Sequence, residues 1–565
     1  MLLLLLLLSL SLSLPFIAAR PLALLPRDNP SITATYSYPS AFSLSSFGLH
    51  VDDTPVPVFS YIDYDYAHYS NGAYNVTYTI TVSSPDYIDS TDSISISPNS
   101  LAIDCSLSDD HYSFTFPLTG TNYIIVKIGS QRELVIFADP PELHNPYDDG
   151  SPVISVTDSS YNADANATSV STDAFQRAID DSAASGAVCY VPAGEYLVGT
   201  LILPSNTRFF VDEGAFVRST ANYDDYELDF EKGGYPIVHW IRTAIDSSNI
   251  SIYGRGMFDA RGADCLAAAT PFKMIVIQPL STTSFTYDGP MIRESGFWTM
   301  TPTMVKYGTI KNLKIINNLT TTENDGIDIM HSSDVTVEHA LIISGDDAYS
   351  LKTWNPSTDV ADSWPKTAGA GDGPGDDPLF TSDTNILITD TVAWTGCIGW
   401  KIGYGTYEPV VNSQVTHSTL YQGAIGFGVD SKQSSSSSVV QNITYESIAV
   451  EQIVEGHGLY YGGWMAIMTR QGNSGVANVK DITVKDITVK DLGGREAHIL
   501  GYDEDATVSN VEITNVTFGD SSSAYSILSG ILTWINNLLG NLVESFDDLK
   551  ISKNGYTSDI SYSTS

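Results

Sequence analysis

The sequence predicts an all-β protein, with a parallel β-helix over residues 153–565 and an N-terminal β-sandwich over residues 28–145. Three observations carry this prediction. Short runs of alternating polar and apolar residues recur along the chain, and turn residues separate them. In the second part, most runs open with Asn or Asp followed by Val or Ile. The length of 565 residues exceeds that of one compact core and favours two domains or a solenoid.

Residues 1–19 are predicted to form a secretory signal peptide. They begin with a run of leucines, stay largely apolar and end in small residues. An uncleaved membrane anchor is the alternative, but the run is short and interrupted by serines. Six Asn-x-Ser/Thr sequons agree with secretion to the extracellular space and predict N-glycosylation at Asn75, Asn166, Asn249, Asn318, Asn442 and Asn515.

The composition limits the partners. The formal net charge is −39, with 66 acidic and 27 basic residues. This balance argues against a nucleic-acid partner, because phosphate contacts need basic patches. It also counts against a polyanionic substrate, unless basic groups gather at the site itself. The alternative explanation of the charge is solubility alone. We expect a monomer without stable membrane association.

The four cysteines, Cys105, Cys189, Cys265 and Cys397, have no metal-ligand spacing, so no metal site is predicted. In an oxidising compartment one or two disulfides remain possible.

The N-terminal sandwich is predicted from runs such as 76–82 and 123–128, and it ends near a Pro/Asp/Gly-rich linker at 140–152. A capped amphipathic helix then follows at 172–179, with Thr172 or Asp173 as the N-cap. It would cover the open end of a solenoid, which otherwise exposes strand edges.

A degenerate repeat continues to the C-terminus. Most steps between copies are roughly 22–37 residues, which suits a parallel β-helix with loops of variable length. A many-stranded sandwich is the alternative, but the persistent Asn/Asp-Val/Ile register argues against it. Copies include residues 249–252, 309–313, 334–337, 385–388, 414–416, 442–444, 478–482 and 510–513.

Two interruptions of the repeat stand out. Residues 354–383 form a long loop rich in Gly, Asp and Pro, of a length that is usually functional or disordered. Residues 524–546 show apolar positions at helical spacing and predict an inserted amphipathic helix. Packing of this helix against the solenoid is the simpler interpretation, because its polar face is not basic.

A cluster of carboxylates marks the candidate site. With coils of roughly 20–25 residues, Asp325 and Asp346 lie on neighbouring coils. Asp347 follows directly, and adjacent strand residues point to opposite faces, so a bend is needed for both to reach one site. Gly345 makes that bend plausible. Buried carboxylates repel one another, so the cluster predicts acid/base chemistry.

The second part of the chain resembles the polygalacturonase–dextranase clan of glycoside hydrolases, families 28 and 49. The resemblance covers roughly residues 153–560 and is carried above all by 324–328 and 345–347 with Lys352; weaker matches are 191–194, 252–256 and 292–295 with Trp298. It implies a right-handed, pectin-lyase-like parallel β-helix. Dextranase-type members also carry a front β-sandwich.

The resemblance implies inverting hydrolysis of an α-linked polysaccharide without a cofactor. It makes Asp346 the acid, and it makes Asp325 and Asp347 the groups that hold and deprotonate water. Inverting enzymes keep acid and base about 6.5–9.5 Å apart to admit that water. Asp328 is expected to face away, because it lies three residues beyond Asp325.

The surroundings of the aspartates decide the expected substrate. Pectin-cleaving relatives have Asn where this chain has Glu323, a Gly-His-Gly where it has Gly396-Cys397-Ile398-Gly399, and Arg-Ile-Lys where it has Asp430-Ser431-Lys432. The missing Arg and the acidic composition favour a neutral, dextran-type glucan. The candidate substrate-binding residues are Glu323, Arg293, Lys352, Trp400, Lys401 and Tyr404, with Lys352 and Arg293 expected to neutralise the aspartates.

Three alternatives remain open. The first is a polygalacturonase or rhamnogalacturonase that holds its uronide differently. The second is a calcium-dependent polysaccharide lyase on the same fold, which would release unsaturated products. The third is a glycan-binding β-helix without catalysis.

Overall fold

The computed structural model describes residues 34–36, 42–72, 75–83, 86–142, 144–354, 382–435, 438–456, 462–470, 477–519, 541–542 and 549–563. The predicted signal peptide and nearly all of the loop at 354–383 lie outside these residues. Of the helix predicted at 524–546, the described residues are β40 (Asn541–Leu542), which pairs with Thr517 and Phe518 as a strand. The prediction of helix is therefore wrong at these two positions.

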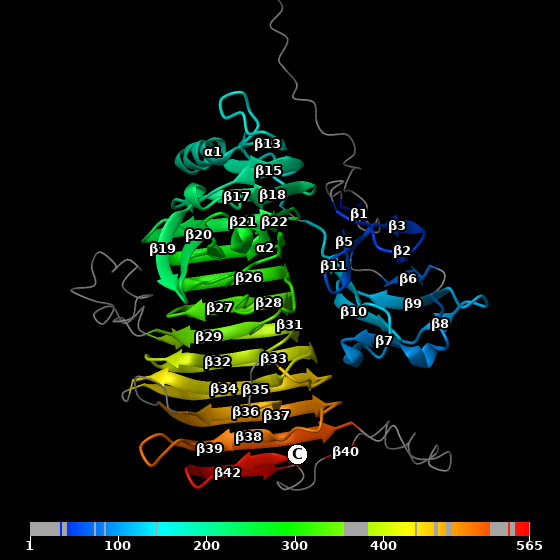
Figure 1. Ribbon diagram of the computed structural model, residues 1–565, viewed down its shortest axis with the longest axis vertical. Coiled ribbons are helices and arrows are strands. Elements are labelled where there is room, and N and C mark those ends of the chain that lie inside the picture. Colours follow the sequence, from blue (N-terminus) through cyan, green and yellow to red (C-terminus); the bar gives the residue numbers. More distant parts are fainter. Residues whose placement is uncertain are drawn as a thin grey trace, which may run out of the picture.

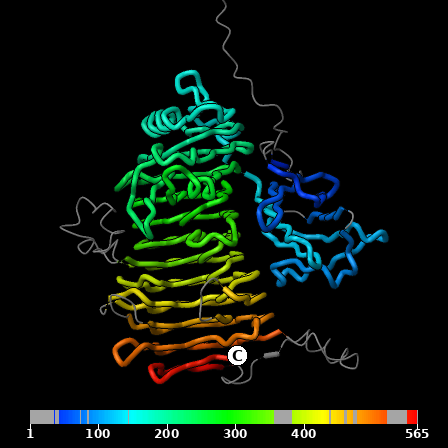
Figure 2. The backbone as a smooth tube through the Cα atoms, viewed as in Figure 1, coloured from blue at the N-terminus to red at the C-terminus, as the bar shows by residue number. Residues whose placement is uncertain are grey.

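The larger part of the molecule is a stack of coils built by parallel strand pairing, which confirms the predicted parallel β-helix (Figure 1). In the described part of the chain, 27 strands form one continuous sheet. Figure 2 shows the coils following one another along the long axis, from the end that carries α1 to the end that carries the C-terminus.

The strands fall into three columns. The first column contains β12 (Val153–Ser155), β14 (Val188–Val191), β17 (Arg208–Val211), β21 (Ser247–Gly254), β24 (Leu280–Asp288), β26 (Thr303–Ile316), β28 (Ser333–Ser344), β31 (Leu387–Thr395), β33 (Val410–Gln422), β35 (Val439–Val450), β37 (Asn478–Val489), β39 (Val508–Phe518) and β42 (Thr557–Ser563). The second column contains β13 (Asn166–Val170), β15 (Gly194–Val198), β18 (Ala215–Ser219), β22 (Met257–Asp259) and β25 (Met291–Arg293).

The third column carries the candidate site. It contains β16 (Leu201–Leu203), β20 (Tyr235–Thr243), β23 (Lys273–Gln278), β27 (Ile327–Met330), β29 (Tyr349–Thr353), β32 (Ile398–Thr406), β34 (Ile425–Ser434), β36 (Gly463–Thr469), β38 (Ala497–Leu500) and β41 (Ile551–Lys553). Met300 joins β23 to β27 by parallel bridges to Ile277 and Ile327. Outside the columns, β19 (Glu227–Lys232) pairs antiparallel with β20, and β30 (Asp383–Thr384) pairs with β33.

The predicted N-terminal cap of the solenoid is α1 (Thr172–Ser185), which buries Phe175, Ala178 and Ile179. Its N-cap is Ser171 rather than Thr172 or Asp173. The Thr172 hydroxyl accepts a hydrogen bond from the Gly199 N–H. A second helix is α2 (Gly262–Ala267). No described helix has the length and apolar character to cross a bilayer.

The N-terminal residues form two further sheets. One contains β1 (Ala34–Thr35), β4 (Val58–Ser60), β5 (Asp65–Ser70), β7 (Ile94–Ser97), β10 (Tyr123–Ile128) and β11 (Leu134–Asp139). The other contains β2 (Gly48–Val51), β3 (Thr54–Val56), β6 (Asn75–Thr81), β8 (Ser106–Leu107) and β9 (Ser113–Thr119). Apolar side chains of both sheets fill one buried cluster, for example Ile80 and Phe114 from the second with Ile124 and Ile136 from the first.

A buried group of charges joins these sheets to the β-helix. The carboxylate of Asp139, at the end of β11, accepts hydrogen bonds from Lys314 Nζ at 2.7 and 2.8 Å. His68 Nε2 lies 2.6 Å from the same carboxylate, and Arg255 Nε lies 3.4 Å away. Asp139, Lys314 and His68 are fully buried. Because a buried carboxylate needs compensating charge, Lys314 of β26 fixes where the N-terminal sheets dock.

The disulfides considered above are not formed. All four cysteines are free thiols. Cys105 precedes β8 in the N-terminal sheets, while Cys189, Cys265 and Cys397 lie in β14, in α2 and after β31. They are therefore distributed over different structural elements rather than brought together in pairs.

Replacing Lys314 by Met is expected to destabilise the protein strongly. The change leaves Asp139 buried with less compensating charge, and breaking a buried pair in this way costs about 3–5 kcal/mol. Thermal or denaturant unfolding measures the loss. Lys311→Met in the same strand is the matched control, because the Lys311 side chain is 39 % exposed and its ion pair contributes about 0–1 kcal/mol. Equal effects of the two changes would contradict a docking role for Lys314.

Candidate active site

Strand alternation directs polar side chains of the third column outward. In β29, Tyr349 and Leu351 fill the interior of the coil, so Lys352 points to the other face. In β32, Trp400 and Ile402 do the same and turn Lys401 outward. The parallel register pairs Ser350 with Lys401 and thus sets the two lysines on neighbouring strands.

Lys352 connects two of the carboxylates. Its Nζ lies 2.7 Å from Asp325 and 2.6 Å from Asp328. Burial alone would lower the pKa of Lys352, but Asp325 and Asp328 outweigh burial and raise it. Burial and the neighbouring Asp325 raise the pKa of Asp328, although Lys352 opposes them.

The expectation that Asp328 faces away is wrong. The argument treated 325–328 as one strand, but β27 begins only at Ile327. Ile327 and Ile329 point into the core, so Asp328 points outward to Lys352. Asp325 lies in the turn before the strand and is therefore not bound by the same alternation.

Asp346 and Asp347 lie in the predicted bend between β28 and β29. Gly345 is required there by close packing, since a Cβ on it would lie 2.2 Å from the carbonyl oxygen of Thr321. The side-chain oxygen of Asn324 accepts hydrogen bonds from the Gly345 and Asp346 N–H groups at 2.8 and 3.2 Å. Asn324 thus ties this bend to the preceding coil, a role that sequence reasoning missed.

The two adjacent aspartates have different surroundings. The half-buried Asp346 carboxylate accepts hydrogen bonds from the N–H groups of Glu323 and Asp347, at 3.1 and 2.9 Å. Asp347 is buried, and its Oδ2 lies 2.7 Å from Lys401 Nζ. Burial opposes the charge of Lys401, but Asp347 outweighs burial and raises the pKa of the ammonium. Among the described residues, no lysine or arginine forms an ion pair with Asp346.

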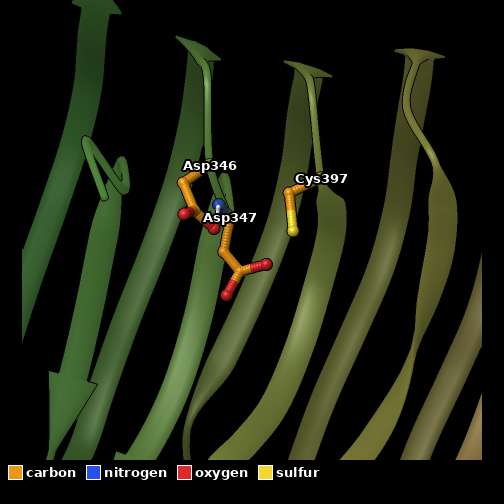
Figure 3. Close-up of side chains that lie close together, drawn as sticks. All are labelled: Asp346, Asp347 and Cys397. Atoms are coloured by element: carbon orange, nitrogen blue, oxygen red, sulfur yellow. Dashed lines mark hydrogen bonds between the residues drawn. The ribbon is translucent and has the colours of Figure 1, made fainter. Parts of the chain in front are cut away.

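Cys397 completes this part of the site. Its sulfur and one carboxylate oxygen each from Asp346 and Asp347 all lie within 4.8 Å of one another (Figure 3). Thr395 places the thiol, because its hydroxyl accepts a hydrogen bond from the Cys397 N–H and donates one to the Asp346 carbonyl. Burial, with Asp347 and Asp346 nearby, raises the pKa of the thiol.

Glu323 lies at one side of the aspartates, between two lysines. Lys232 Nζ lies 2.7 Å from its carboxylate, and Lys273 forms a second ion pair. Burial would raise the pKa of Glu323, but the two lysines outweigh burial and lower it. Lys232 ends β19, so the β19–β20 hairpin contacts the coil that carries Asp325.

A basic group lies at the other side, around the half-exposed ring of Tyr404. Lys401, Lys432 and Arg470 lie 3.6, 5.3 and 5.5 Å from the ring centroid. The Arg470 guanidinium forms two hydrogen bonds with the buried carboxylate of Asp430, one of them 2.7 Å long. Sequence reasoning missed Arg470, because it follows β36, one coil beyond the position where Arg was sought.

Two candidate binding residues lie elsewhere. Arg293 is in the second column, where its guanidinium covers the rings of Phe42 and Tyr61 at 4.3 and 4.9 Å. Its ion-pair partners among the described residues are Asp259 and Glu294, so the expected neutralisation of the aspartates is not supported.

Trp400 is 1 % exposed and packs inside the coil against Tyr349, at 5.8 Å between ring centroids. Alternation along β32 turns it inward, so the expected contact with substrate is not supported either. Trp354, by contrast, is half-buried and lies 5.6 Å from the ring of Trp298, which Lys352 also approaches.

The parallel β-helix gathers aspartates along one column of strands, and comparison with known families assigns the chain to the β-helical glycoside hydrolases. Residues 189–530, more than half of the chain, match the family Glycosyl hydrolases family 28. The chain belongs to this family. A curated endo-polygalacturonase of Pectobacterium parmentieri is 27% identical over 212 residues, which are 33% of this chain and 52% of the relative. The chain thus spans about half the length of that relative.

Solved structures extend the likeness in fold to nearly the whole chain. Dex49A from Penicillium minioluteum superposes with a TM-score of 0.54 at 12% identity, over 95% of this chain and 96% of that one. The family 28 exopolygalacturonase of Yersinia enterocolitica gives 0.51 at 14% identity, over 92% and 98%. At such identities the likeness concerns the fold alone.

Replacing Asp328 by Asn is expected to stabilise the protein increasingly as pH rises. In the folded protein the pKa of Asp328 lies above its unfolded value. Its favourable contribution is therefore complete below the unfolded pKa and is lost as pH rises through the folded pKa. The neutral amide does not titrate, so the difference in thermal midpoint between variant and wild type grows from pH 4 to pH 8. A difference that is constant or shrinks over this range contradicts a raised pKa.

Proposed function

We propose that this chain hydrolyses α-glycosidic bonds in a polyuronide by inversion, as a polygalacturonase-type enzyme. The observation that carries the proposal is the gathering of cations around the aspartates. The chain holds 66 acidic against 27 basic residues, yet the described residues of the site include as many cations as carboxylates. The cations are Lys232, Lys273, Lys352, Lys401, Lys432 and Arg470, and the carboxylates are Glu323, Asp325, Asp328, Asp346, Asp347 and Asp430.

The ion pairs support a division of roles among the three aspartates. A carboxylate that takes a proton from water must be charged, and Asp325 and Asp347 are the two that face lysine ammonium groups. Asp346 has backbone N–H donors instead and is the more exposed. It is thus the member best placed to carry a proton to the leaving glycosidic oxygen. Asp325 and Asp347 would hold and deprotonate the water.

The group around Tyr404 supports a uronide over a neutral sugar. The Asp430 carboxylate binds the guanidinium group of Arg470 and keeps it beside the site. Lys432 lies near the ring of Tyr404 as well. Guanidinium and ammonium groups bind carboxylates through charge-assisted hydrogen bonds. The expectation of a dextran-type glucan rested on a missing arginine and on the acidic composition. Arg470 supplies an arginine at the site, and the cations around the aspartates offset the acidic composition locally. The similarity to a polygalacturonase points the same way.

Several further proposals rest on the sequence. We propose that the two N-terminal sheets are a β-sandwich domain, that the protein is exported by residues 1–19, and that it acts as an extracellular, glycosylated monomer on polysaccharide. The sequon asparagines are exposed or half-buried in the structure, which leaves them open to modification: Asn75, Asn166, Asn249, Asn318, Asn442 and Asn515.

Asp346→Asn is expected to lower hydrolysis by at least about 10²-fold, because the amide cannot donate the acid's proton to the leaving oxygen. Reducing-sugar release from polygalacturonate, rhamnogalacturonan, pullulan and dextran measures the effect and identifies the substrate. Asp390→Asn is the matched control, since that side chain is 70 % exposed. Unsaturated products would contradict hydrolysis and indicate a lyase; unchanged turnover in the Asp346→Asn variant would contradict the role of the acid.

Lys432→Gln is expected to raise KM for polygalacturonate by about 10-fold or more with little change in kcat, since a hydrogen bond between charged groups contributes about 1.5–3 kcal/mol. Arg470→Lys keeps a charge for Asp430 but loses the planar fork, so it should act in the same direction. Lys485→Gln, at a side chain 44 % exposed in β37, is the control. An unchanged KM in both site variants contradicts carboxylate binding by this group.

A further inference from the structure

The aspartates of the candidate site share their position with a thiol that the proposed hydrolysis does not use. Cys397 is 6 % exposed and free. Its sulfur lies within 4.8 Å of a carboxylate oxygen of Asp346 and of one of Asp347, which are also that close to each other. Figure 3 shows the Asp347 carboxylate extending between the side chains of Asp346 and Cys397.

One oxygen at this position forms no hydrogen bond of normal geometry with the described residues, and the Asp347 carboxylate has the thiol of Cys397, a weak donor, as its neighbour. Lys401 binds Oδ2 of Asp347, whereas Oδ1 is buried without a partner among the described residues. A buried polar atom without a partner costs free energy, so Asp347 Oδ1 is disposed to accept a ligand. The Asp347 side chain is 3 % exposed, so its burial restricts it to small movements.

The charge around the aspartates also favours a cation. Among the described residues, Lys352 and Lys401 are the cations that form ion pairs with the carboxyl groups of Asp325, Asp328, Asp346 and Asp347. Three carboxylates still face these two ammonium groups when Asp328 is protonated. The basic group around Tyr404 lies to one side of them, beyond Lys401. A divalent ion between Asp346 and Asp347 would offset the surplus of negative charge.

A thiol with carboxylates selects among cations. Thiolate sulfur favours zinc-type ions, whereas calcium and magnesium require oxygen ligands in larger number. Zinc binds sulfur at about 2.3 Å and carboxylate oxygen at about 2.0–2.2 Å. In tetrahedral geometry these lengths separate the ligand atoms by about 3.3–3.6 Å, so closing on the ion needs side-chain shifts of about 1 Å.

We propose that Asp346, Asp347 and Cys397 form an inhibitory site for a soft divalent cation such as Zn²⁺ or Cd²⁺. Binding releases the thiol proton to solvent and forms a metal–sulfur bond, with Oδ1 of Asp347 and the Asp346 carboxylate as further ligands. The ion occupies the carboxylates that would handle the protons of hydrolysis, and it therefore blocks the reaction. The inhibition rests on the proposed function; the binding does not.

Titration of the full-length protein with CdCl₂ tests the binding without an activity assay. Wild type is expected to take up one Cd²⁺ and to develop the ultraviolet charge-transfer band of a cadmium–thiolate bond. Cys397→Ser should lose the band. Its affinity for Cd²⁺ should fall by at least about 10–100-fold, the effect of losing a contact that only supports a metal ligand. Cys105→Ser is the control and should keep the band, because that half-buried thiol is in the N-terminal sheets. CaCl₂ should bind far more weakly.

Three results would overturn the proposal: no Cd²⁺ uptake by wild type, an unchanged band in Cys397→Ser, or equal affinity for calcium. Cadmium should also inhibit wild-type hydrolysis at concentrations that leave Cys397→Ser active. Binding through Cys397 without inhibition would overturn the inhibitory role. Absence of hydrolysis in metal-free wild type would instead overturn the proposed function and leave the metal site standing, so the two failures are distinguishable.

Discussion

The parallel backbone ladder is the constraint on which the rest of the structure depends. From β29 to β38, each strand of the third column hydrogen-bonds to the strands of the coils before and after it, and the register pairs Ile327 with Tyr349 and Tyr349 with Trp400. Fixing these pairs also fixes the turns that precede them. Backbone pairing therefore brings the carboxylates of successive coils close together, and no contact between the carboxylates themselves is needed. Inward apolar residues then decide by alternation which side chains remain outside.

This stacking creates an electrostatic problem that lysines resolve. Aligned turns and strands bring Asp325, Asp328 and Asp347 into a buried region, where like charges repel and desolvation penalises each of them. Lys352 and Lys401 occupy outward positions on the next strands and form ion pairs with them. Among the residues that the structure describes, no lysine forms an ion pair with Asp346. The division between paired and unpaired carboxylates thus follows from the coil geometry.

The charge of the whole chain and the charge of the site differ for a physical reason. An excess of acidic residues acts over the entire surface, whereas recognition depends on groups within a few ångströms of the ligand, since salt screens beyond about 8–10 Å. Arg470 and Lys432 gather at Tyr404 although basic residues are scarce overall. Asp139 and Lys314 form another buried ion pair, and this pair joins the N-terminal sheets to the β-helix.

The sequence by itself determined the parallel β-helix, its N-terminal helix and the cluster of Asp325, Asp346 and Asp347, because these follow from local periodicity and from short motifs. Only the tertiary structure decided the neighbours of that cluster. The outward position of Asp328 depends on where β27 begins, which periodicity does not locate to one residue. Arg293 and Trp400 have suitable chemistry but lie in another column or inside the coil. Arg470 reaches Tyr404 from a later coil, since stacking, not sequence distance, sets which side chains meet.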